Sequence, residues 1–238
     1  LTMETMKRVA TRHGLVCLLH EKPFAGVNGS GKHDNWSLTT DAGENLLDPG
    51  DTPNENLQFL LVLACIIRAV DLHADILRCS AACVGNEHRL GAQEAPPAII
   101  SIFLGDQLDN VVEQIVSNAE SIKLLTTGKL DSGVSTVPVL DKDTTDRNRT
   151  SPLAFTGNKF EFRMVGSSDS IAEANVALNA IVAESLCEAA DILESAEDFH
   201  TACSKLIHDW MSQHQRVIFN GDGYSEAWVK EAARRGLP

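Results

Sequence analysis

An apolar stretch over residues 57–67, followed by Arg68, constrains the fold of this chain more than any other feature. It is too short to span a bilayer, which takes about 20 consecutive apolar residues in a helix. We therefore expect a buried helix over residues 55–83, entered through the turn and capping residues 51–54. A chain of 238 residues, 43% hydrophobic and 22% charged, can bury a core around such a helix.

The pattern along the rest of the chain mixes helical and alternating spacing. Helical spacing predicts further helices over residues 2–13, 107–125, 171–200, 202–213 and 225–235. Apolar or alternating runs predict strands at residues 15–19, around Trp36 and at residues 158–164. Residues 126–146 are polar, contain glycine and proline, and fit a loop or an insertion. The expected class is α+β, with short strands separated by long helices and no second core.

Charge and cysteine content limit the partners and the compartment. The formal net charge of −13 argues against a nucleic-acid partner, which demands a surplus of Lys and Arg. The six cysteines form no CxxC pair, which predicts reduced, mostly buried thiols in a cytoplasmic protein. No secretory signal and no membrane span are visible. The chain begins at Leu1 in one helical run and ends at Pro238 just after another, so we expect a piece of a longer protein.

The loop around residues 26–33 contains a partial nucleotide-binding motif. Residues 26–32 match GxxxxGK, but the next position holds His33 instead of the Ser or Thr whose hydroxyl ligates Mg²⁺ in a P-loop. A P-loop also opens a helix, whereas the residues after His33 alternate like a strand. We therefore reject the P-loop. On such a strand, His33 and Asn35 point the same way, toward a possible metal ion and phosphate.

Three other segments carry charge in fixed patterns. On the strand Lys159-Phe160-Glu161-Phe162-Arg163, a carboxylate and two cations share one face, which suits a metal ion and anionic groups as well as plain solvent exposure. Residues 86–97 (NEHRLGAQEAPP) place a cation and a carboxylate in a loop stiffened by two prolines. Residues 147–151 (RNRTS) place two guanidinium groups beside hydroxyls.

Together, these four segments resemble the glutamine synthetases in order and spacing. The shared motifs are the NGSG-x-H-x-[HN] loop, the R-L-x(4)-E-A-P loop, the N-R-[ST] segment and the E-x-R strand. The amino-acid sequence of residues 22–33 and 148–163 is similar to that of the type III branch, and the resemblance extends over essentially the whole chain. It implies that residues 1–238 are part of the catalytic domain, a curved antiparallel β-sheet (partial barrel) flanked by long α-helices. The N-terminal domain and the first metal-binding strands would lie upstream of Leu1.

In that family, the carboxylate of glutamate attacks the γ-phosphate of ATP, and ammonia then displaces phosphate from γ-glutamyl phosphate. The resemblance implies ATP and Mg²⁺ or Mn²⁺ as cofactors, a ring-type homo-oligomer, and glutamine biosynthesis in nitrogen metabolism. It also implies a role for each matching residue. The expected metal ligands are His33 and Glu161; the substrate-binding residues Asn28, Gly29, Arg89 and Arg163; the nucleotide-binding residues Asn35, Ser37, Lys159 and Arg149; and the catalytic residues Glu94 and Arg149. Glu94 would be the flap carboxylate that excludes water and accepts a proton from ammonium.

One departure and two alternatives stay open. Other branches carry a further Arg at the position of Ala154, so phosphate binding must differ here. A related γ-glutamyl amine ligase, or a glutamate–cysteine-type ligase, would share these residues and differ only in the acceptor pocket. A non-catalytic paralogue kept for binding or assembly usually loses a metal ligand or the flap carboxylate, whereas this chain keeps His33, Glu161 and Glu94.

Overall fold

The computed structural model describes residues 1–91, 93–118, 124, 129–130, 140–141 and 150–238. Its centre is a four-stranded sheet in the order β1-β6-β5-β2, formed by β1 (Gly31–Trp36), β6 (Phe160–Gly166), β5 (Leu153–Phe155) and β2 (Ile102–Phe103). β6 runs antiparallel to both β1 and β5. The sheet is open, with β1 and β2 at its edges.

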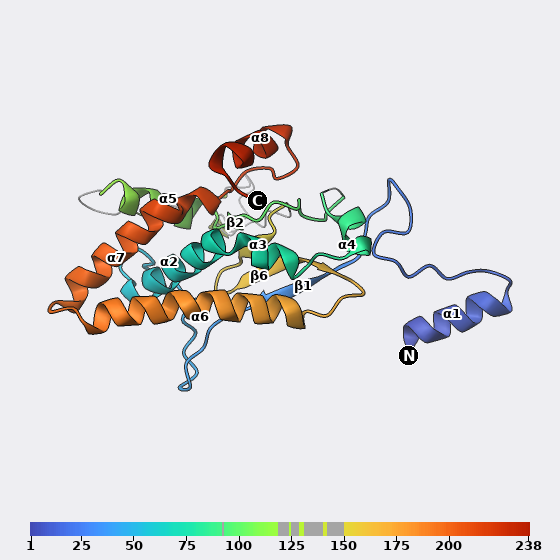
Figure 1. Cartoon of the computed structure of the whole chain (residues 1–238), viewed down its shortest axis with the longest axis horizontal. Helices are drawn as coiled ribbons and strands as arrows, with labels where there is room; N and C mark the ends of the chain where they lie inside the picture. Colours follow the sequence, from blue (N-terminus) through green and yellow to red (C-terminus); the bar gives the residue numbers. More distant parts are fainter. Residues whose placement is uncertain (92, 119–123, 125–128, 131–139, 142–149) are drawn as a thin grey trace.

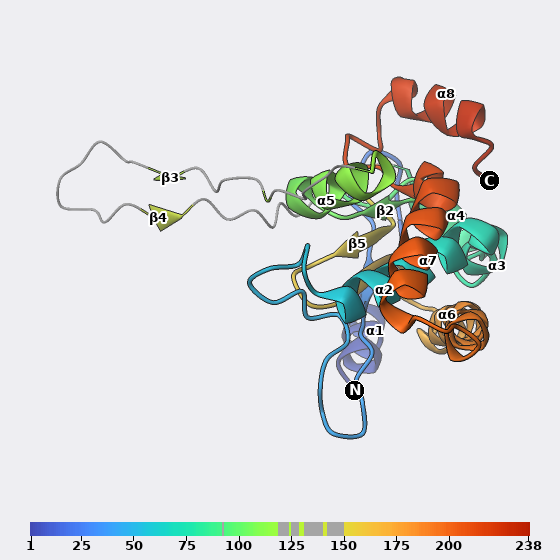
Figure 2. The same cartoon turned by 90° about the vertical axis from the view of Figure 1, so that its left-hand side faces the viewer.

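One strand departs from the expected antiparallel arrangement, because β2 lies parallel to β5. Parallel neighbours need a long crossover, and here residues 104–152 provide it. That crossover contains α5 (Asp106–Val116) and the short ladder of β3 (Lys129–Leu130) and β4 (Leu140–Asp141), which lies away from the main sheet in Figure 2. Most of the predicted loop at 126–146 falls outside the described residues. The α+β class is confirmed.

Three long helices pack together against the sheet: α2 (Leu57–Leu72), α6 (Ala172–Glu194) and α7 (Phe199–His214) (Figure 1). The apolar stretch lies within α2, where eleven residues are buried, as the sequence predicts. Phe59 of α2 contacts Phe155 of β5, and Trp36 of β1 donates a hydrogen bond to Asn179 of α6. The core therefore lies between α2 and the sheet.

The predicted helix over residues 55–83 is two helices. The Asn56 side chain caps α2 by accepting from Phe59 N, and the helix ends at His73, whose backbone (φ −122°, ψ 31°) is not helical. α3 (Ala74–Cys79) and α4 (Val84–Arg89) follow. The His73 imidazole pairs with Glu184 of α6 at 2.7 Å, so a tertiary contact accompanies the break.

Two other predicted boundaries change. The single helix expected over residues 171–200 ends at Glu194, and Asp198 caps the start of α7 by accepting from His200 N and Thr201 N. α5 begins at Asp106 and ends at Val116, earlier than predicted, and residues 119–123 lie outside the described part. The last helix is confirmed as α8 (Glu226–Arg235), capped by Ser225.

The predicted strand at residues 15–19 is wrong. These residues are described, and they have no regular structure. Leu15 N donates to Ala10 O and so closes the end of α1 (Thr2–Arg12), while Leu15 and Val16 are exposed. A strand needs a neighbour to accept its hydrogen bonds, and none of the described strands pairs with this segment. Figure 1 shows α1 outside the body formed by the sheet and the long helices.

Among the described helices, none is both long and apolar enough to cross a membrane.

Candidate functional site

His33 and Glu161 face each other across two paired strands. In the β1–β6 ladder Asn35 lies opposite Glu161, and the register shifts between Lys32 and Asp34, the position of His33. His33 Nδ1 lies 2.9 Å from Glu161 Oε1, and which atom carries the proton depends on the imidazole tautomer. The two side chains converge as the sequence predicts, while their role as metal ligands stays a prediction.

The second oxygen of Glu161 is held by Arg163, two residues along the same face of β6. Arg163 donates to Oε2 through Nε at 2.8 Å and lies 2.7 Å from it through Nη2. Burial disfavours the charged carboxylate, but the hydrogen bond and charge of Arg163, together with His33, outweigh it and hold the pKa of Glu161 below its usual value. Glu161 is therefore a carboxylate between an imidazole and a guanidinium.

A cavity of about 350 Å³ opens over this cluster. It joins the three predicted segments that the structure describes: the loop before β1, the loop after α4 and strand β6. Its lining residues are Gly29, Gly31, His33, Arg89, Gln93, Glu94, Ala95, Glu161 and Arg163. Six of the eleven predicted site residues thus share one cavity.

Glu94 reaches this cavity from a strained loop. It is exposed and has φ 70°, and its neighbour Gln93 has φ 53°, both in the left-handed region that non-glycine residues rarely adopt. Gly91 N donates to Pro96 O at 2.9 Å, and the Tyr224 hydroxyl donates to Ala95 O at 2.9 Å. The loop is therefore tied at its base, and Glu94 is part of the cavity lining.

Three predicted nucleotide residues, Asn35, Ser37 and Lys159, are not among the residues that line the cavity. Asn35 is exposed on β1, and Ser37 just after it donates to Asn45 Oδ1 at 2.7 Å. Lys159 is half-buried in the turn between β5 and β6, next to Asn158, whose carbonyl accepts from Asn45. Asn28 is exposed and outside the lining. Arg149 lies outside the described residues.

Sequence reasoning assigned no role to several residues around the cavity. Asn86 is completely buried, Glu21 is 6% exposed, and Gly31 lies against the Arg89 guanidinium. Asn86 and Gly31 lie within the predicted motifs, but the predicted roles went to other residues of those motifs. Only the packing in the structure shows that Asn86 and Gly31 contribute to the site. No pattern in the sequence marks Glu21. Ala154, where other branches have an Arg, is a fully buried residue of β5 opposite Glu161 in the ladder.

The donor set fits part of a divalent-metal site. Imidazole nitrogen and carboxylate oxygen are ligands that such ions accept, and the two are already adjacent. Among the described residues, no cluster of three or more His, Cys, Asp or Glu side chains is arranged to hold a metal. His33 and Glu161 would therefore supply two ligands, and others must come from water, substrate or elsewhere.

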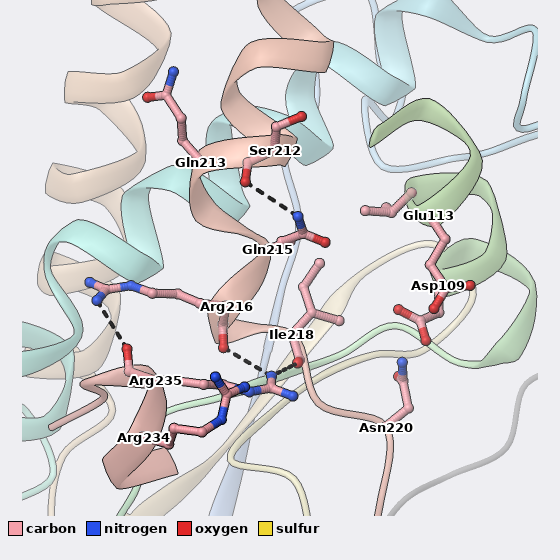
Figure 3. A pocket seen from close by; sticks show the side chains of 11 residues that line it. Asp109, Glu113, Ser212, Gln213, Gln215, Arg216, Ile218, Asn220, Arg234 and Arg235 are labelled. Atoms are coloured by element: carbon pink, nitrogen blue, oxygen red, sulfur yellow. Dashed lines mark hydrogen bonds between the residues drawn. The ribbon is translucent and has the colours of Figure 1, made fainter. Parts of the chain in front are cut away.

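A second, larger cavity of about 560 Å³ lies between α5, the end of α7 and α8 (Figure 3), and none of the predicted site residues that the structure describes lines it. Its cationic side chains are engaged. Arg235 donates to the carbonyls of Arg216 and Ile218, and Arg234 pairs with Glu231. Asp109 and Glu113 line the opposite wall. With its guanidinium groups already used, this cavity is a weaker anion site than the one over Glu161.

Comparisons with known proteins identify the family of this chain. The chain matches the model of the glutamine synthetase catalytic domain over residues 1–98 and that of the glutamine synthetase C-terminal domain over residues 202–238. The chain belongs to the glutamine synthetase family. It is 59% identical to a type-3 glutamine synthetase of Dictyostelium discoideum, over 99% of this chain and 32% of that protein. The predicted resemblance to the type III branch is thereby confirmed.

Two further relatives define the extent of the match. A glutamine synthetase of Bacteroides fragilis is 47% identical over 100% of this chain and 33% of its own length. A solved structure described as "Apo GmaS without ligand" aligns with 99% of this chain and 47% of its own, at 17% identity and a TM-score of 0.46, which carries no weight in the assignment. The chain spans about a third of the length of the curated relatives it matches.

Proposed function

We propose that this chain is part of the catalytic domain of an ATP-dependent ligase that joins ammonia to L-glutamate through γ-glutamyl phosphate, giving glutamine, ADP and phosphate. The observation that carries the proposal is the contact of His33 with Glu161 in a cavity that also holds Arg163 and Glu94. The names of the relatives support the same activity.

Each residue has a task in this chemistry that follows from its charge and position. When bound, Mg²⁺ or Mn²⁺ would neutralise charge on the ATP phosphates, and His33 and Glu161 would hold it. Arg163 fixes the rotamer of Glu161 and presents positive charge to a carboxylate or phosphoryl group. Glu94, on its strained loop, would cover the site and accept a proton from ammonium.

The nucleotide would lie along the exposed end of β1. Asn35 and Ser37 are exposed there, and Lys159 follows in the adjacent turn, so amide, hydroxyl and ammonium groups line one edge. A Lys in place of an Arg keeps the charge but loses bidentate binding. Arg149, Asn28 and Gly29 complete the proposed site by family resemblance, and we propose a homo-oligomer on the same ground.

The test is glutamine formation by the full-length protein that contains this chain. We expect turnover with glutamate, ATP and ammonium, and a loss of at least about 100-fold in Glu161→Ala, because a ligand of the metal is removed. Glu173→Gln, which changes an exposed carboxylate of α6, is the matched control and keeps full activity.

Small amines separate the alternatives. Turnover with an amine and none with ammonia would identify an amine ligase. Absence of any turnover, in protein that still binds ATP, would contradict the proposal and favour a non-catalytic paralogue.

A further inference from the structure

A turn near the end of the chain, residues 219–224, packs against the loop that follows α4 and carries Glu94. In that loop residues 95–97 are buried, whereas Glu94 itself is exposed. A Cβ at Gly223 would lie 3.2 Å from Pro97 Cγ, so the turn approaches the loop closely. We call residues 219–224 the C-terminal turn.

The C-terminal turn is fixed to the sheet and to α8. Phe219 N donates to Ile102 O of β2 at 2.8 Å. Asn220 Oδ1 accepts from Leu104 N, just after β2, at 2.9 Å. The Phe219 ring stacks on that of Trp228 of α8, with the ring centroids 3.7 Å apart, and Trp228 is 1% exposed. Whatever the turn holds is therefore held in place relative to the sheet.

Tyr224, the last residue of the turn, reaches the loop after α4. Its hydroxyl donates to Ala95 O at 2.9 Å, next to Glu94, and its own backbone N donates to Asp222 Oδ1 at 2.9 Å. Burial raises the pKa of the Tyr224 hydroxyl, and the carboxylates of Glu94 and Asp222 act in the same direction. The hydroxyl is therefore a neutral donor at physiological pH.

The contact matters because the loop has a strained backbone. Gln93 and Glu94 both have positive φ, and such conformations persist only where the surrounding structure holds them. The hydrogen bond from Gly91 N to Pro96 O closes the loop on itself. The Tyr224 hydroxyl ties it to another element, so losing that hydroxyl lets the strained part of the loop relax and carry Glu94 with it.

The C-terminal turn also contacts a second predicted segment. Gly223 N donates to Thr150 Oγ1 at 2.8 Å. Thr150 directly follows Arg149, a predicted catalytic residue outside the described part. The loop after α4 lies in the region that matches the catalytic domain, and the turn lies in the region that matches the C-terminal domain. One region thus holds a loop of the candidate site that belongs to the other.

We propose that Tyr224 is a positioning residue: its hydroxyl holds the loop after α4 so that Glu94 covers the cavity and keeps water from γ-glutamyl phosphate. This rests on the proposed function and on the proposed role of Glu94 as the flap carboxylate. When the loop is loose, water attacks the acyl carbon in place of ammonia. A C–O bond forms, the bond from that carbon to the phosphate oxygen breaks, and glutamate and phosphate leave. ATP is then consumed without forming glutamine.

The experiment measures this uncoupling in the full-length protein. The variant is Tyr224→Phe, which removes only the hydroxyl, and the readout is the ratio of phosphate released to glutamine formed. We expect the ratio to rise at least about threefold, a change of the size that one lost hydrogen bond produces. A merely destabilised protein would lose both products together and keep the ratio. An unchanged ratio in Tyr224→Phe therefore overturns the proposal.

Ser195→Ala is the matched control. The Ser195 hydroxyl also donates to a backbone carbonyl, that of Ile192, at 2.9 Å, but it lies at the exposed end of α6. This variant should keep the wild-type ratio. An equal rise in both variants would show that the ratio responds to any lost hydroxyl, and the specific role of Tyr224 would be wrong.

A double-mutant cycle tests whether Tyr224 acts through Glu94. Glu94→Ala should raise the ratio by itself, and Tyr224→Phe should add little in that background, because the carboxylate that it positions is already gone. Equal effects of Tyr224→Phe with and without Glu94 would refute the coupling.

Hydrogen exchange separates this proposal from the ligase activity, because it needs no turnover. The backbone amides of residues 93–95 should exchange faster in Tyr224→Phe than in wild type, since the loop opens more often. Equal exchange rates would show that the hydroxyl does not hold the loop, whatever the activity. Wild-type protein that makes no glutamine would disprove the proposed function, and the exchange rates alone would then decide whether Tyr224 holds the loop.

Discussion

Cys65 shows at the residue scale how burial changes a side chain's chemistry. It lies on α2 with 0% exposure, and burial raises the pKa of its thiol to about 12. Cys203 on α7 is also buried, whereas Cys79 and Cys187 are exposed. All six cysteines are free, as expected. Only Cys65 and Cys203 are buried, so the prediction of mostly buried thiols is wrong. Composition reports the number of cysteines, and only packing reports their access to solvent.

We predict that Cys65 makes the folded state lose stability as the solution becomes alkaline. A thiol in the unfolded chain ionises near pH 8.5, whereas Cys65 in the folded chain keeps its proton to about pH 12. Above about pH 8.5 the unfolded state therefore binds fewer protons than the folded one, and the free energy of unfolding falls with rising pH. Urea unfolding at pH 8 and at pH 10 measures this effect. Between these two pH values, the free energy of unfolding should fall by about 1–2 kcal/mol less in Cys65→Ala than in wild type.

Thiol labelling supplies the control for this prediction. Cys79 and Cys187 should react with iodoacetamide in the folded chain at pH 8, and Cys65 only after unfolding. If Cys65 in the folded chain were labelled as fast as Cys79, the prediction that its thiol stays buried and protonated would be wrong.

Asp71 joins elements from the two ends of the chain. It lies near the end of α2, with its side chain 3% exposed, and its oxygens contact His214 Nδ1 of α7 at 2.8 Å and Arg216 Nε at 2.7 Å. α2 lies in the part that matches the glutamine synthetase catalytic domain, and α7 and Arg216 lie in the part that matches the C-terminal domain. This ion network therefore connects the two matched regions through a buried carboxylate.

We predict that Asp71→Ala lowers the free energy of unfolding by about 2–4 kcal/mol, because it removes a buried carboxylate that holds both the largely buried His214 imidazole and the Arg216 guanidinium. Urea denaturation measures the loss. Asp209→Ala is the matched control: Asp209 also contacts a histidine, His208, at 3.1 Å, but its side chain is 42% exposed, and the expected cost is below about 1 kcal/mol. Equal losses in the two variants would show that the Asp71 network adds nothing beyond a surface pair.

At the scale of elements, the helices and strands with the clearest local sequence patterns were predicted best. The alternation over residues 158–164 predicted β6, and Ser225 marked the start of α8, because these signals depend on near neighbours. The break at His73 coincides with a contact to Glu184 of α6, and β2 pairs in parallel with β5, a strand about fifty positions further along the chain. Local periodicity contains no information about such contacts.

The whole molecule combines a buried core with parts that lack partners among the described residues. α2, α6 and α7 pack together, yet α1 buries none of its residues, and an isolated helix of that length is marginal in water. The cavity brings two metal-type ligands together, and a divalent ion takes more. The described residues thus form a folded core and supply two candidate metal ligands.

We therefore predict that the 238-residue chain on its own folds but forms no glutamine. Circular dichroism during thermal unfolding should show a cooperative transition, because the core around α2 is complete. An assay with glutamate, ATP, ammonium and Mn²⁺ should show no product. Measurable turnover by the chain alone would overturn the view that further ligands and substrate contacts come from outside it.

The sequence by itself determined the family, the α+β class, the buried helix and the set of charged residues that surround one cavity. Motif spacing carries that information, since residues two apart on a strand share a face whatever the rest of the chain does. Only the tertiary structure decided that β2 runs parallel to β5, that helix α2 ends at His73, and that Arg89 donates to the carbonyls of β6. The physical reason is that hydrogen-bond partners and buried space are set by residues far apart in the chain, which meet only when it folds.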